Sequence, residues 1–267
     1  MREKRDVRGR ILQNVRVGAG VFRLRLFLPR LAGSFLPGQF LQLRLRPGDV
    51  APFLRRPFAP SDYEPEGLSL IYAVAGRGTR LLSELPPGAE VDVLAPLGNS
   101  FSLLPAGSAA VLAGGGVGFA GLLPLARRLS SDGVEVTGAL GTGTAAALPP
   151  ESAFPDFPGR LLIATDDGSR GFHGNVVDAL GAEGIAGTAA RLYACGPLPM
   201  LAAAARLAAA EGVGCEVSLE ARLACGFGAC LGCAVPVLDG KGYRRVCRDG
   251  PVFAADALDW PALLAGG

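Results

Sequence analysis

The chain has 267 residues, of which 49% are hydrophobic and 19% charged, and its formal net charge at pH 7 is +2. This length suffices for two or three domains with sizeable cores, and the apolar content excludes an intrinsically disordered chain. A charge this close to zero excludes the broad basic surface of a nucleic-acid-binding protein. The residues from Met1 to Arg5 show no secretory signal, so we expect a cytoplasmic protein.

Residues 1–101 are predicted to form an antiparallel barrel of short strands. Apolar residues alternate with arginines over 21–28, and the alternation returns over 39–45 after a Pro-Gly turn. Two further strands are expected at 68–75 and 89–94. Short strands at this spacing, separated by Pro and Gly turns, favour a small antiparallel β-barrel.

Two stretches of this barrel could hold a cofactor. In Arg55-Arg56-Pro57-Phe58-Ala59 a guanidinium stands beside an aromatic ring, a pair that could meet a diphosphate and a flat ring system. From Ile71 to Thr79 a strand leads through glycines into a predicted helix at 80–85, whose free N–H groups suit a phosphate. An edge strand and an ordinary helix cap explain the same residues, so neither stretch is decisive alone.

Strands and helices alternate through residues 102–213. Strands are predicted at 109–113, 134–140, 160–165 and 191–195, and helices at 119–129, 175–180 and 198–210. Such alternation is typical of a parallel sheet with helices on both faces, which binds ligands beyond the carboxyl ends of its strands. We therefore predict an α/β domain in this part of the chain.

The apolar run over 108–126 raises the alternative of a membrane span. The glycines from Gly114 to Gly118 would interrupt a helix in the middle of this run, and Gly121 and Pro124 follow them. A buried strand, a glycine turn and a buried helix account for the same residues, so we expect no membrane span.

Turns at the predicted strand ends could face a nucleotide. Gly116, Gly118 and Gly121 form a G-x-G-x-x-G pattern after the first strand of the α/β domain, a weak signal when it stands alone. The acidic residue usual at the end of the second strand is missing, and no Arg or Lys there would receive a 2'-phosphate, which favours NAD over NADP. Asp166-Asp167 ends the third strand, where a plain Asp-Gly turn is an equal explanation.

Cys195 ends the last predicted strand of this domain, before Gly196 and Pro197. A thiol that faces a helix N-terminus would have a lowered pKa and could approach a bound ring. We favour the simpler interpretation of a small buried residue before a tight turn. The single histidine, His173, is interpreted as a loop residue, so no acid–base catalyst is predicted.

Four of the six cysteines are spaced C-x4-C-x2-C-x13-C, at Cys225, Cys230, Cys233 and Cys247. This is the plant-type ferredoxin spacing for a [2Fe-2S] cluster, and the glycines between the first three would let backbone amides face the sulfides. Four thiolates also suit zinc, although only Cys230 and Cys233 have the C-x2-C spacing usual in zinc sites. Disulfides are disfavoured because no secretory signal is seen. We predict a [2Fe-2S] cluster, with zinc as the alternative.

In this order, a barrel, a glycine-rich α/β domain and a cysteine loop resemble the ferredoxin reductase superfamily. Within it, residues 218–233 and 243–253 are similar to the signature of the dihydroorotate dehydrogenase B electron-transfer subunits. The resemblance implies a multidomain α+β protein with an FAD barrel at 1–101, an NAD-binding α/β domain at 102–213 and a [2Fe-2S] domain at 214–267.

The resemblance also implies site residues and partners. FAD would contact Arg56, Pro57, Phe58, Ala59, Ile71, Tyr72, Ala73, Gly78 and Thr79. NAD(H) would contact Gly114, Gly115, Gly116, Gly118, Asp166, Asp167, Cys195, Gly196 and Pro197, with Cys195 near the nicotinamide. The four cysteines would hold the cluster. Two positions depart from the superfamily pattern, since Ala59 stands where a Ser often bonds the flavin and Gly121 where a Pro often follows the glycine loop.

The implied function is electron transfer in pyrimidine biosynthesis. A separate FMN-containing catalytic subunit would oxidise dihydroorotate to orotate, in a heterotetramer with two copies of each subunit. This chain would pass the electrons through [2Fe-2S] and FAD to NAD+. The alternatives are a diaphorase-type ferredoxin:NAD(P)+ reductase, a hydrogenase or sulfide-reductase subunit and, in another class, a zinc-binding adaptor.

Overall fold

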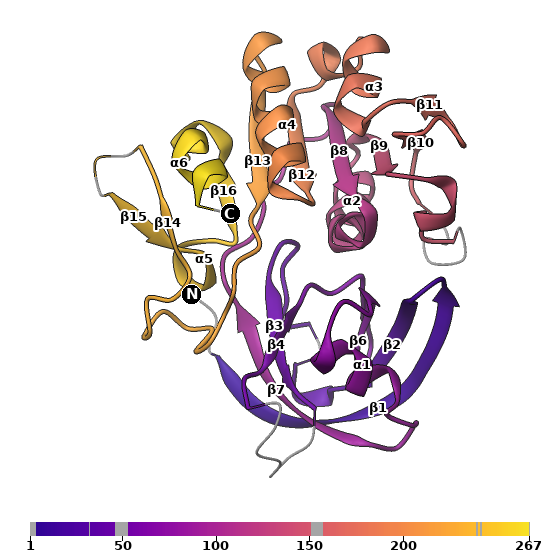
Figure 1. Cartoon of the computed structure of the whole chain (residues 1–267), viewed down its shortest axis with the longest axis vertical. Coiled ribbons are helices and arrows are strands. Elements are labelled where there is room, and N and C mark those ends of the chain that lie inside the picture. The colour runs from indigo at the N-terminus through magenta and orange to yellow at the C-terminus, as the bar shows by residue number, and fades with distance from the viewer. Residues whose placement is uncertain are drawn as a thin grey trace.

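The computed structural model describes residues 4–31, 33–45, 53–150, 157–238, 240 and 242–266. Within these ranges the chain forms two seven-stranded sheets and one two-stranded sheet. In Figure 1 the first sheet lies below the second, and the C-terminal elements lie beside both. No helix in the described ranges is long and apolar enough to cross a membrane.

The first sheet is antiparallel and curls into a half-barrel (Figure 1). Its strand order is β4-β3-β7-β1-β2-β6-β5. The bounds are β1 Arg5–Gly18, β2 Val21–Phe27, β3 Phe40–Arg44, β4 Arg56–Phe58, β5 Asp62–Glu64, β6 Gly67–Ala73 and β7 Glu90–Leu97, with η1 Pro29–Leu31 and α1 Arg77–Ser83 between them. The two edge strands do not pair with each other in the part of the chain that is described, so the predicted barrel is an open, curled sheet.

The core of the half-barrel is built from the predicted alternation. Leu24 and Leu26 of β2 and Leu41 and Leu43 of β3 are fully buried in one apolar cluster. Strand β1 was not predicted. Its sequence carries five arginine and aspartate side chains, and few of its positions are buried, so the hydrophobic period that would reveal a strand is weak.

The second sheet has the order β11-β10-β9-β8-β12-β13-β16 and is parallel except at β16. The bounds are β8 Ala109–Gly115, β9 Glu135–Thr142, β10 Arg160–Thr165, β11 Phe172–His173, β12 Arg191–Cys195, β13 Gly214–Ser218 and β16 Val252–Ala254. The predicted parallel sheet is confirmed. Its last two strands lie within 214–267, so the C-terminal segment shares this sheet.

Helices cover both faces of the second sheet, as predicted. The helical bounds are η2 Gly116–Leu122, α2 Leu123–Ser131, η3 Ala145–Ala147, α3 Val176–Ala182, η5 Ala186–Thr188 and α4 Leu198–Ala210. Leu112 of β8 packs with the α2 side, and its neighbour Val111 packs with α3 and α4. The helix predicted at 119–129 is divided, because the glycines keep its first part in a 3-10 helix before α2 begins.

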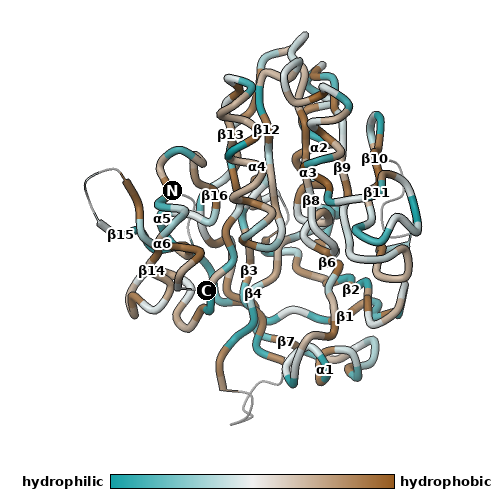
Figure 2. The backbone as a smooth tube through the Cα atoms, turned by 45° about the horizontal axis from the view of Figure 1, so that its top comes forward, coloured by the Kyte–Doolittle hydropathy of each residue, from teal (hydrophilic) through white to brown (hydrophobic). Residues whose placement is uncertain are grey.

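The remaining C-terminal elements flank the sheets. A hairpin pairs β14 Ala234–Pro236 with β15 Tyr243–Arg245, followed by α5 Val246–Asp249, η6 Ala255–Ala257 and α6 Trp260–Ala265. Hydrophobic (brown) and hydrophilic (teal) stretches alternate along the tube in Figure 2, as expected for elements with one buried and one exposed face.

Asn99 ties the half-barrel to the segment that follows α5. Its Nδ2 donates to the carbonyls of Asp249 (3.2 Å) and Val252 (2.8 Å), and its Oδ1 accepts from the Val252 N–H (3.0 Å). Its own N–H donates to the Gly250 carbonyl at 2.7 Å. The first and last parts of the chain are thereby joined directly after β7.

Replacing Asn99 with Ala is expected to lower the free energy of unfolding by about 1–3 kcal/mol, because three side-chain hydrogen bonds are lost and their backbone partners are left unpaired. Denaturant titration of the purified chain measures the change. Ser100→Ala is the matched control and is expected to change it by less than about 0.5 kcal/mol. Equal losses in the two variants would contradict the role given to Asn99.

Candidate functional site

The four candidate cluster cysteines are arranged as two pairs. Cys233 and Cys247 are buried, with their sulfurs 3.3 Å apart. Cys225 Sγ accepts a hydrogen bond from the N–H of Cys230 at 3.5 Å, and Cys230 is exposed. Among the described residues, no three metal-ligating side chains converge on one metal position. Two thiol pairs suit two irons with two protein ligands each better than they suit one tetrahedral ion.

The backbone around Cys225 stabilises its thiolate, which is the form that binds metal. Burial raises the pKa of Cys225, but hydrogen bonds led by the N–H groups of Cys230 and Phe227 outweigh it and lower the pKa to about 6. Burial, reinforced by the Cys233 thiol, raises the pKa of Cys247 to about 12. Backbone amides that donate to the Cys225 sulfur are the kind of donor found around iron–sulfur clusters, so the residues of this loop fit a [2Fe-2S] cluster.

The two candidate flavin stretches meet at Arg56 and Gly78. A Cβ on Gly78 would lie 2.3 Å from Arg56 Nε, so a larger residue there would require this guanidinium to move. Arg56 also donates to the Leu54 carbonyl. The Thr79 hydroxyl accepts from the N–H groups of Ala75 (2.9 Å) and Gly76 (3.1 Å), which caps α1. The helix-cap explanation of Thr79 therefore holds for its side chain, while Arg56 and Gly78 form a joint surface.

Tyr72 supports Phe58 from within the half-barrel. The Tyr72 ring is buried, with its centroid 5.9 Å from that of Phe58 in an edge-on contact and 5.6 Å from that of Phe22 in a stacked one. Its hydroxyl donates to Asn14 Oδ1 at 3.0 Å, and burial raises its pKa. Of the predicted flavin residues, Tyr72 and Ile71 thus lie in the protein interior and position those nearer the surface.

A cavity of about 170 Å³ lies where the three parts of the chain meet. It is smaller than a site for a whole cofactor, so it forms one portion of a larger binding surface. Its lining combines the candidate flavin stretch, the end of β12, the segment that leads to the cysteines, the first residue of α5, and Pro251 two residues after α5. The lining residues include Pro57, Phe58, Ala59, Cys195, Ser218, Leu219, Glu220, Ala221, Leu223, Val246 and Pro251.

The glycine turn after β8 packs against the turn after β12. Cys195 pairs with Gly114 in the sheet register. A Cβ on Gly115 would lie 2.6 Å from Pro197 Cδ, and one on Gly118 would lie 2.8 Å from the Cys195 carbonyl oxygen. These glycines are required by the close approach of two neighbouring strand ends, which brings the candidate nicotinamide residues 114–118 and 195–197 together.

Asp166 and Asp167 lie at the same edge of the sheet but two strands away, after β10. The Asp167 carboxylate accepts from the Ser169 hydroxyl (2.5 Å) and N–H (3.0 Å), and these bonds lower its pKa. The two aspartates therefore lie at the carboxyl-terminal edge of the parallel strands, two strands away from the glycine turn. The hydrogen bonds from Ser169 are those of a plain Asp-Gly turn, and they account for the position of Asp167.

Cys195 is a buried residue with a neutral thiol. Burial, reinforced by the negative charge of Glu220, raises its pKa to about 12. This is the opposite of the shift expected from a helix N-terminus, and the favoured interpretation as a small buried residue is confirmed. Glu220 lines the same cavity and was not singled out from the sequence, although it belongs to the stretch at 218–233 that carries the family resemblance.

Comparison with known proteins identifies the family. Residues 220–259 match the family model of the iron-sulfur cluster binding domain of dihydroorotate dehydrogenase B. The electron transfer subunit of dihydroorotate dehydrogenase B (NAD(+)) from Bacillus caldolyticus is 44% identical over 224 residues, which cover 82% of this chain and 85% of that one. The subunit of the same name from Caldanaerobacter subterraneus subsp. tengcongensis is 37% identical over 254 residues, covering 94% and 98%. The chain belongs to this family of electron transfer subunits.

Solved structures share the fold of this chain. A chain from the structure of an NADH-dependent reduced ferredoxin-NADP oxidoreductase has a TM-score of 0.85 and 31% identity, covering 96% of this chain and 91% of that one. The ferredoxin reductase of carbazole 1,9a-dioxygenase, at 20% identity and a TM-score of 0.68, covers 79% and 67% and shares the fold. The fold class predicted for this dihydroorotate dehydrogenase B family member is confirmed.

The two positions at which this electron transfer subunit departs from the superfamily pattern face each other. A Cβ on Gly121 would lie 3.2 Å from Ala59 Cβ and 3.9 Å from Cys195 Sγ. Small residues at both positions therefore allow the half-barrel and the glycine turn to approach closely. In the sequence, Ala59 and Gly121 are two separate departures from the superfamily pattern. In the structure, the two residues are in contact with each other.

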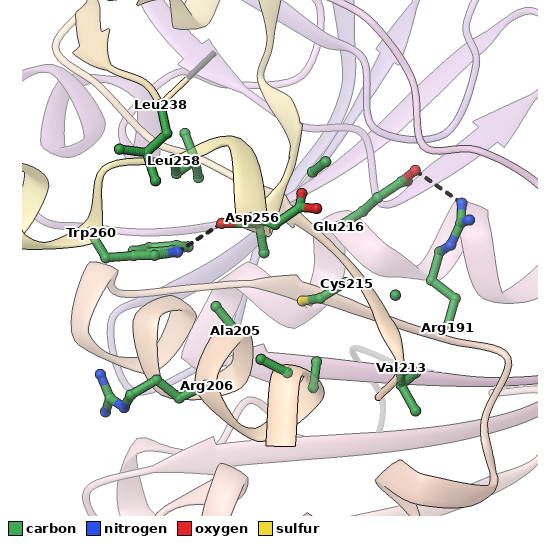
Figure 3. Close-up of a pocket in the computed structure, with 15 residues that line it drawn as sticks. Arg191, Ala205, Arg206, Val213, Cys215, Glu216, Leu238, Asp256, Leu258 and Trp260 are labelled. Atoms are coloured by element: carbon green, nitrogen blue, oxygen red, sulfur yellow. Dashed lines mark hydrogen bonds and ion pairs between the residues drawn. The ribbon is translucent and has the colours of Figure 1, made fainter. Parts of the chain in front are cut away.

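A larger cavity of about 620 Å³ lies elsewhere in this electron transfer subunit, between α4, β13 and the C-terminal elements. None of the predicted site residues lines it. Figure 3 shows Glu216 turned toward Arg191 and the Trp260 indole turned toward the chain beside Asp256. The Glu216–Arg191 ion pair is 3.1 Å long, and the indole N–H donates to the Ala255 carbonyl at 2.8 Å. These polar groups are engaged within the protein.

The contact between Ala59 and Gly121 is testable with a double-mutant cycle. Gly121→Ala is expected to be less destabilising in the Ala59→Gly background than in the wild type, because Ala59→Gly removes the carbon that the new methyl group would crowd. We expect a coupling of at least about 0.5 kcal/mol in the free energy of unfolding. Gly181→Ala, whose Cβ would make only an ordinary contact at 3.6 Å, is the control and should be additive with Ala59→Gly. Additivity at Gly121 would contradict the contact.

Proposed function

We propose that this chain is the electron transfer subunit of an NAD-dependent dihydroorotate dehydrogenase that converts dihydroorotate to orotate in pyrimidine biosynthesis. It carries electrons from a catalytic subunit through a [2Fe-2S] cluster and FAD to NAD+. The observation that supports this most directly is the cavity at which the candidate flavin stretch, Cys195 and the cysteine-bearing segment meet. A flavin exchanges hydride with a nicotinamide and single electrons with an iron–sulfur centre, which this arrangement of segments would serve.

In this proposal the residues of the chain bind and orient the cofactors and exclude water from them. The Arg56 guanidinium pairs with the negative charge of a diphosphate, and Gly78 leaves room for this guanidinium. Phe58, in edge-on contact with Tyr72, lines the cavity. Cys195 stays a neutral thiol and packs without exchanging a proton, so no acid–base catalyst is assigned. The remaining FAD and NAD contacts are proposed as predicted from the sequence, with NAD preferred over NADP, and Cys225, Cys230, Cys233 and Cys247 hold the cluster.

The partner is proposed to be an FMN-containing catalytic subunit, in a heterotetramer with two copies of each chain. Its docking face is the cysteine loop, where Cys230 is exposed and large apolar side chains remain in solvent. Phe227, Leu231 and Tyr243 are 47%, 61% and 68% exposed. An exposed apolar rim around a metal ligand suits a protein partner that must come within electron-transfer distance. The three parts are proposed at 1–101, 102–213 and 214–267, and reduced cysteines suit the cytoplasm.

A second candidate function is a reductase with a different electron partner. The structural similarity to the ferredoxin-NADP oxidoreductase chain favours this alternative, since it extends over nearly the whole of both chains. The zinc-binding adaptor is disfavoured by the arrangement of the four thiols as two pairs. The two reductase functions differ in the electron donor, so a parallel assay supplies reduced ferredoxin in place of the catalytic subunit and dihydroorotate.

The experiment combines the anaerobically purified chain with the FMN-containing catalytic subunit and supplies dihydroorotate and NAD+. NAD+ reduction is expected only when both subunits are present. Cys230→Ser is expected to remove the cluster and abolish this activity, while FAD content and NADH-driven dye reduction remain, because Cys230 lies outside the flavin stretch. Cys215→Ser, at a cysteine in β13 outside the cluster loop, is the matched control and should retain activity.

Three outcomes would contradict the proposal. Dihydroorotate oxidation by the isolated chain would mean that the proposal assigns this reaction to the wrong subunit. Loss of flavin together with the cluster in Cys230→Ser would mean that the two sites are not separable. Electron transfer from reduced ferredoxin but not from the catalytic subunit would favour the second candidate.

Gly78→Ala is expected to weaken FAD binding about tenfold, equivalent to about 1.4 kcal/mol, because the added carbon would displace the Arg56 guanidinium. Gly76→Ala is the matched control in the same turn, since a Cβ there would meet nothing within 4 Å. Flavin fluorescence titration of the FAD-depleted chains measures both dissociation constants. Equal affinities in the two variants would contradict the role of Arg56 in FAD binding.

A further inference from the structure

Gln42 lies between the half-barrel and the cysteine loop. It is the central residue of β3, paired with Pro57 of β4 on one side and Leu94 of β7 on the other. Its neighbours Leu41 and Leu43 point into the core of the half-barrel. Because side chains alternate along a strand, Gln42 points to the opposite face, toward the C-terminal segment.

The Gln42 carboxamide is buried without a hydrogen-bond partner. The residue has no exposed surface, and neither Oε1 nor Nε2 has a partner within the part of the chain that the structure describes. Gln39, just before the same strand, differs: its Oε1 accepts from the Leu36 N–H at 2.9 Å and its Nε2 donates to the Gly98 carbonyl at 3.0 Å. Buried amides are almost always hydrogen-bonded, so the unpaired carboxamide of Gln42 indicates a ligand.

The carboxamide faces the backbone beside the first cysteine of the loop. A Cβ on Gly226 would lie 2.3 Å from Gln42 Oε1 and 3.2 Å from Nε2, so the amide occupies the space of a missing side chain. Gly226 directly follows Cys225 and has a φ of +78°, a conformation that glycine adopts without strain. An amide group can turn to present either its NH2 or its oxygen, so the donor is available on this side.

We infer that Gln42 is a positioning residue for the iron–sulfur cluster. When the four cysteines bind the cluster, the NH2 group of Gln42 donates to the anionic sulfur ligands beside Cys225. This bond holds the Cys225 part of the loop against β3, the strand that pairs with Pro57 of β4. This inference rests on the proposed function, because it requires a cluster at the four cysteines. A donor to a cluster sulfur stabilises the added electron and raises the reduction potential.

The test compares variants of the full-length, anaerobically prepared chain. Gln42→Leu removes both polar atoms at nearly the same volume, and Gln42→Glu replaces the donor with an acceptor. Gln13→Leu, the same substitution on β1 of the same sheet, is the matched control. The measurements are the cluster midpoint potential by redox titration with electron paramagnetic resonance, the rate of cluster loss to a chelator, and the thermal midpoint with and without the cluster.

We expect Gln42→Leu to make reduction of the cluster about tenfold less favourable, a shift of about 59 mV for one electron, and Gln42→Glu to lower the potential further. Both variants should lose the cluster faster than wild type, with altered resonance g-values and unchanged FAD content. Without the cluster, Gln42→Leu should be at least as thermally stable as wild type, since it removes an unpaired buried amide. A purely structural role would destabilise both forms and leave the potential unchanged.

A cluster in Gln42→Leu with the potential, spectrum and loss rate of Gln13→Leu would overturn the inference while leaving the proposed function intact. Absence of iron and acid-labile sulfide from the wild type would instead overturn the proposed function, and the inference with it. If Gln42→Leu does not fold, Gln42→Met, which also lacks the donor, is subject to the same criteria.

Discussion

The short segment from Gly250 to Val252 is the connection on which the arrangement of the molecule depends. The Asn99 side chain binds the backbone of Val252 on both its N–H and its carbonyl, which joins the segment to the half-barrel. The same Val252 pairs with Ser218 at the edge of the α/β sheet. Because α5, which carries Cys247, immediately precedes this segment, one stretch of backbone sets the positions of a candidate cluster ligand and both sheets.

Close approaches at glycine occur where these parts face each other. Gly78 leaves space for Arg56 within the half-barrel, Gly226 leaves space for Gln42 at the cysteine loop, and Gly115 leaves space for Pro197 at the carboxyl-terminal edge of the parallel strands. At each position a methyl group would overlap another residue. The candidate site is therefore shaped by backbone that approaches without side chains, which is how a protein admits flat rings and clusters close to its main chain.

The polar groups of the candidate site differ in whether the protein itself satisfies them. The Thr79 hydroxyl caps a helix, and the Asp167 carboxylate is bonded by Ser169. The Cys225 sulfur receives backbone donors, and the Gln42 carboxamide receives none among the described residues. Thr79 and Asp167 are thus held by partners within the protein, whereas the described part of the chain offers Gln42 none. Only three-dimensional proximity separates the two kinds.

The sequence by itself determined the type and order of most elements, and its cysteine spacing is what predicts the four candidate cluster ligands. Hydrophobic alternation and strand–helix periodicity are local properties, and the spacing of Cys225, Cys230, Cys233 and Cys247 is chemical information carried in one short stretch. Strand β1 escaped prediction because its arginines hide the period. Only the tertiary structure decided that Ala59 meets Gly121, that the cysteines form two pairs, and that Gln42 faces Gly226. These are contacts between residues far apart in the chain, and local patterns carry no information about them.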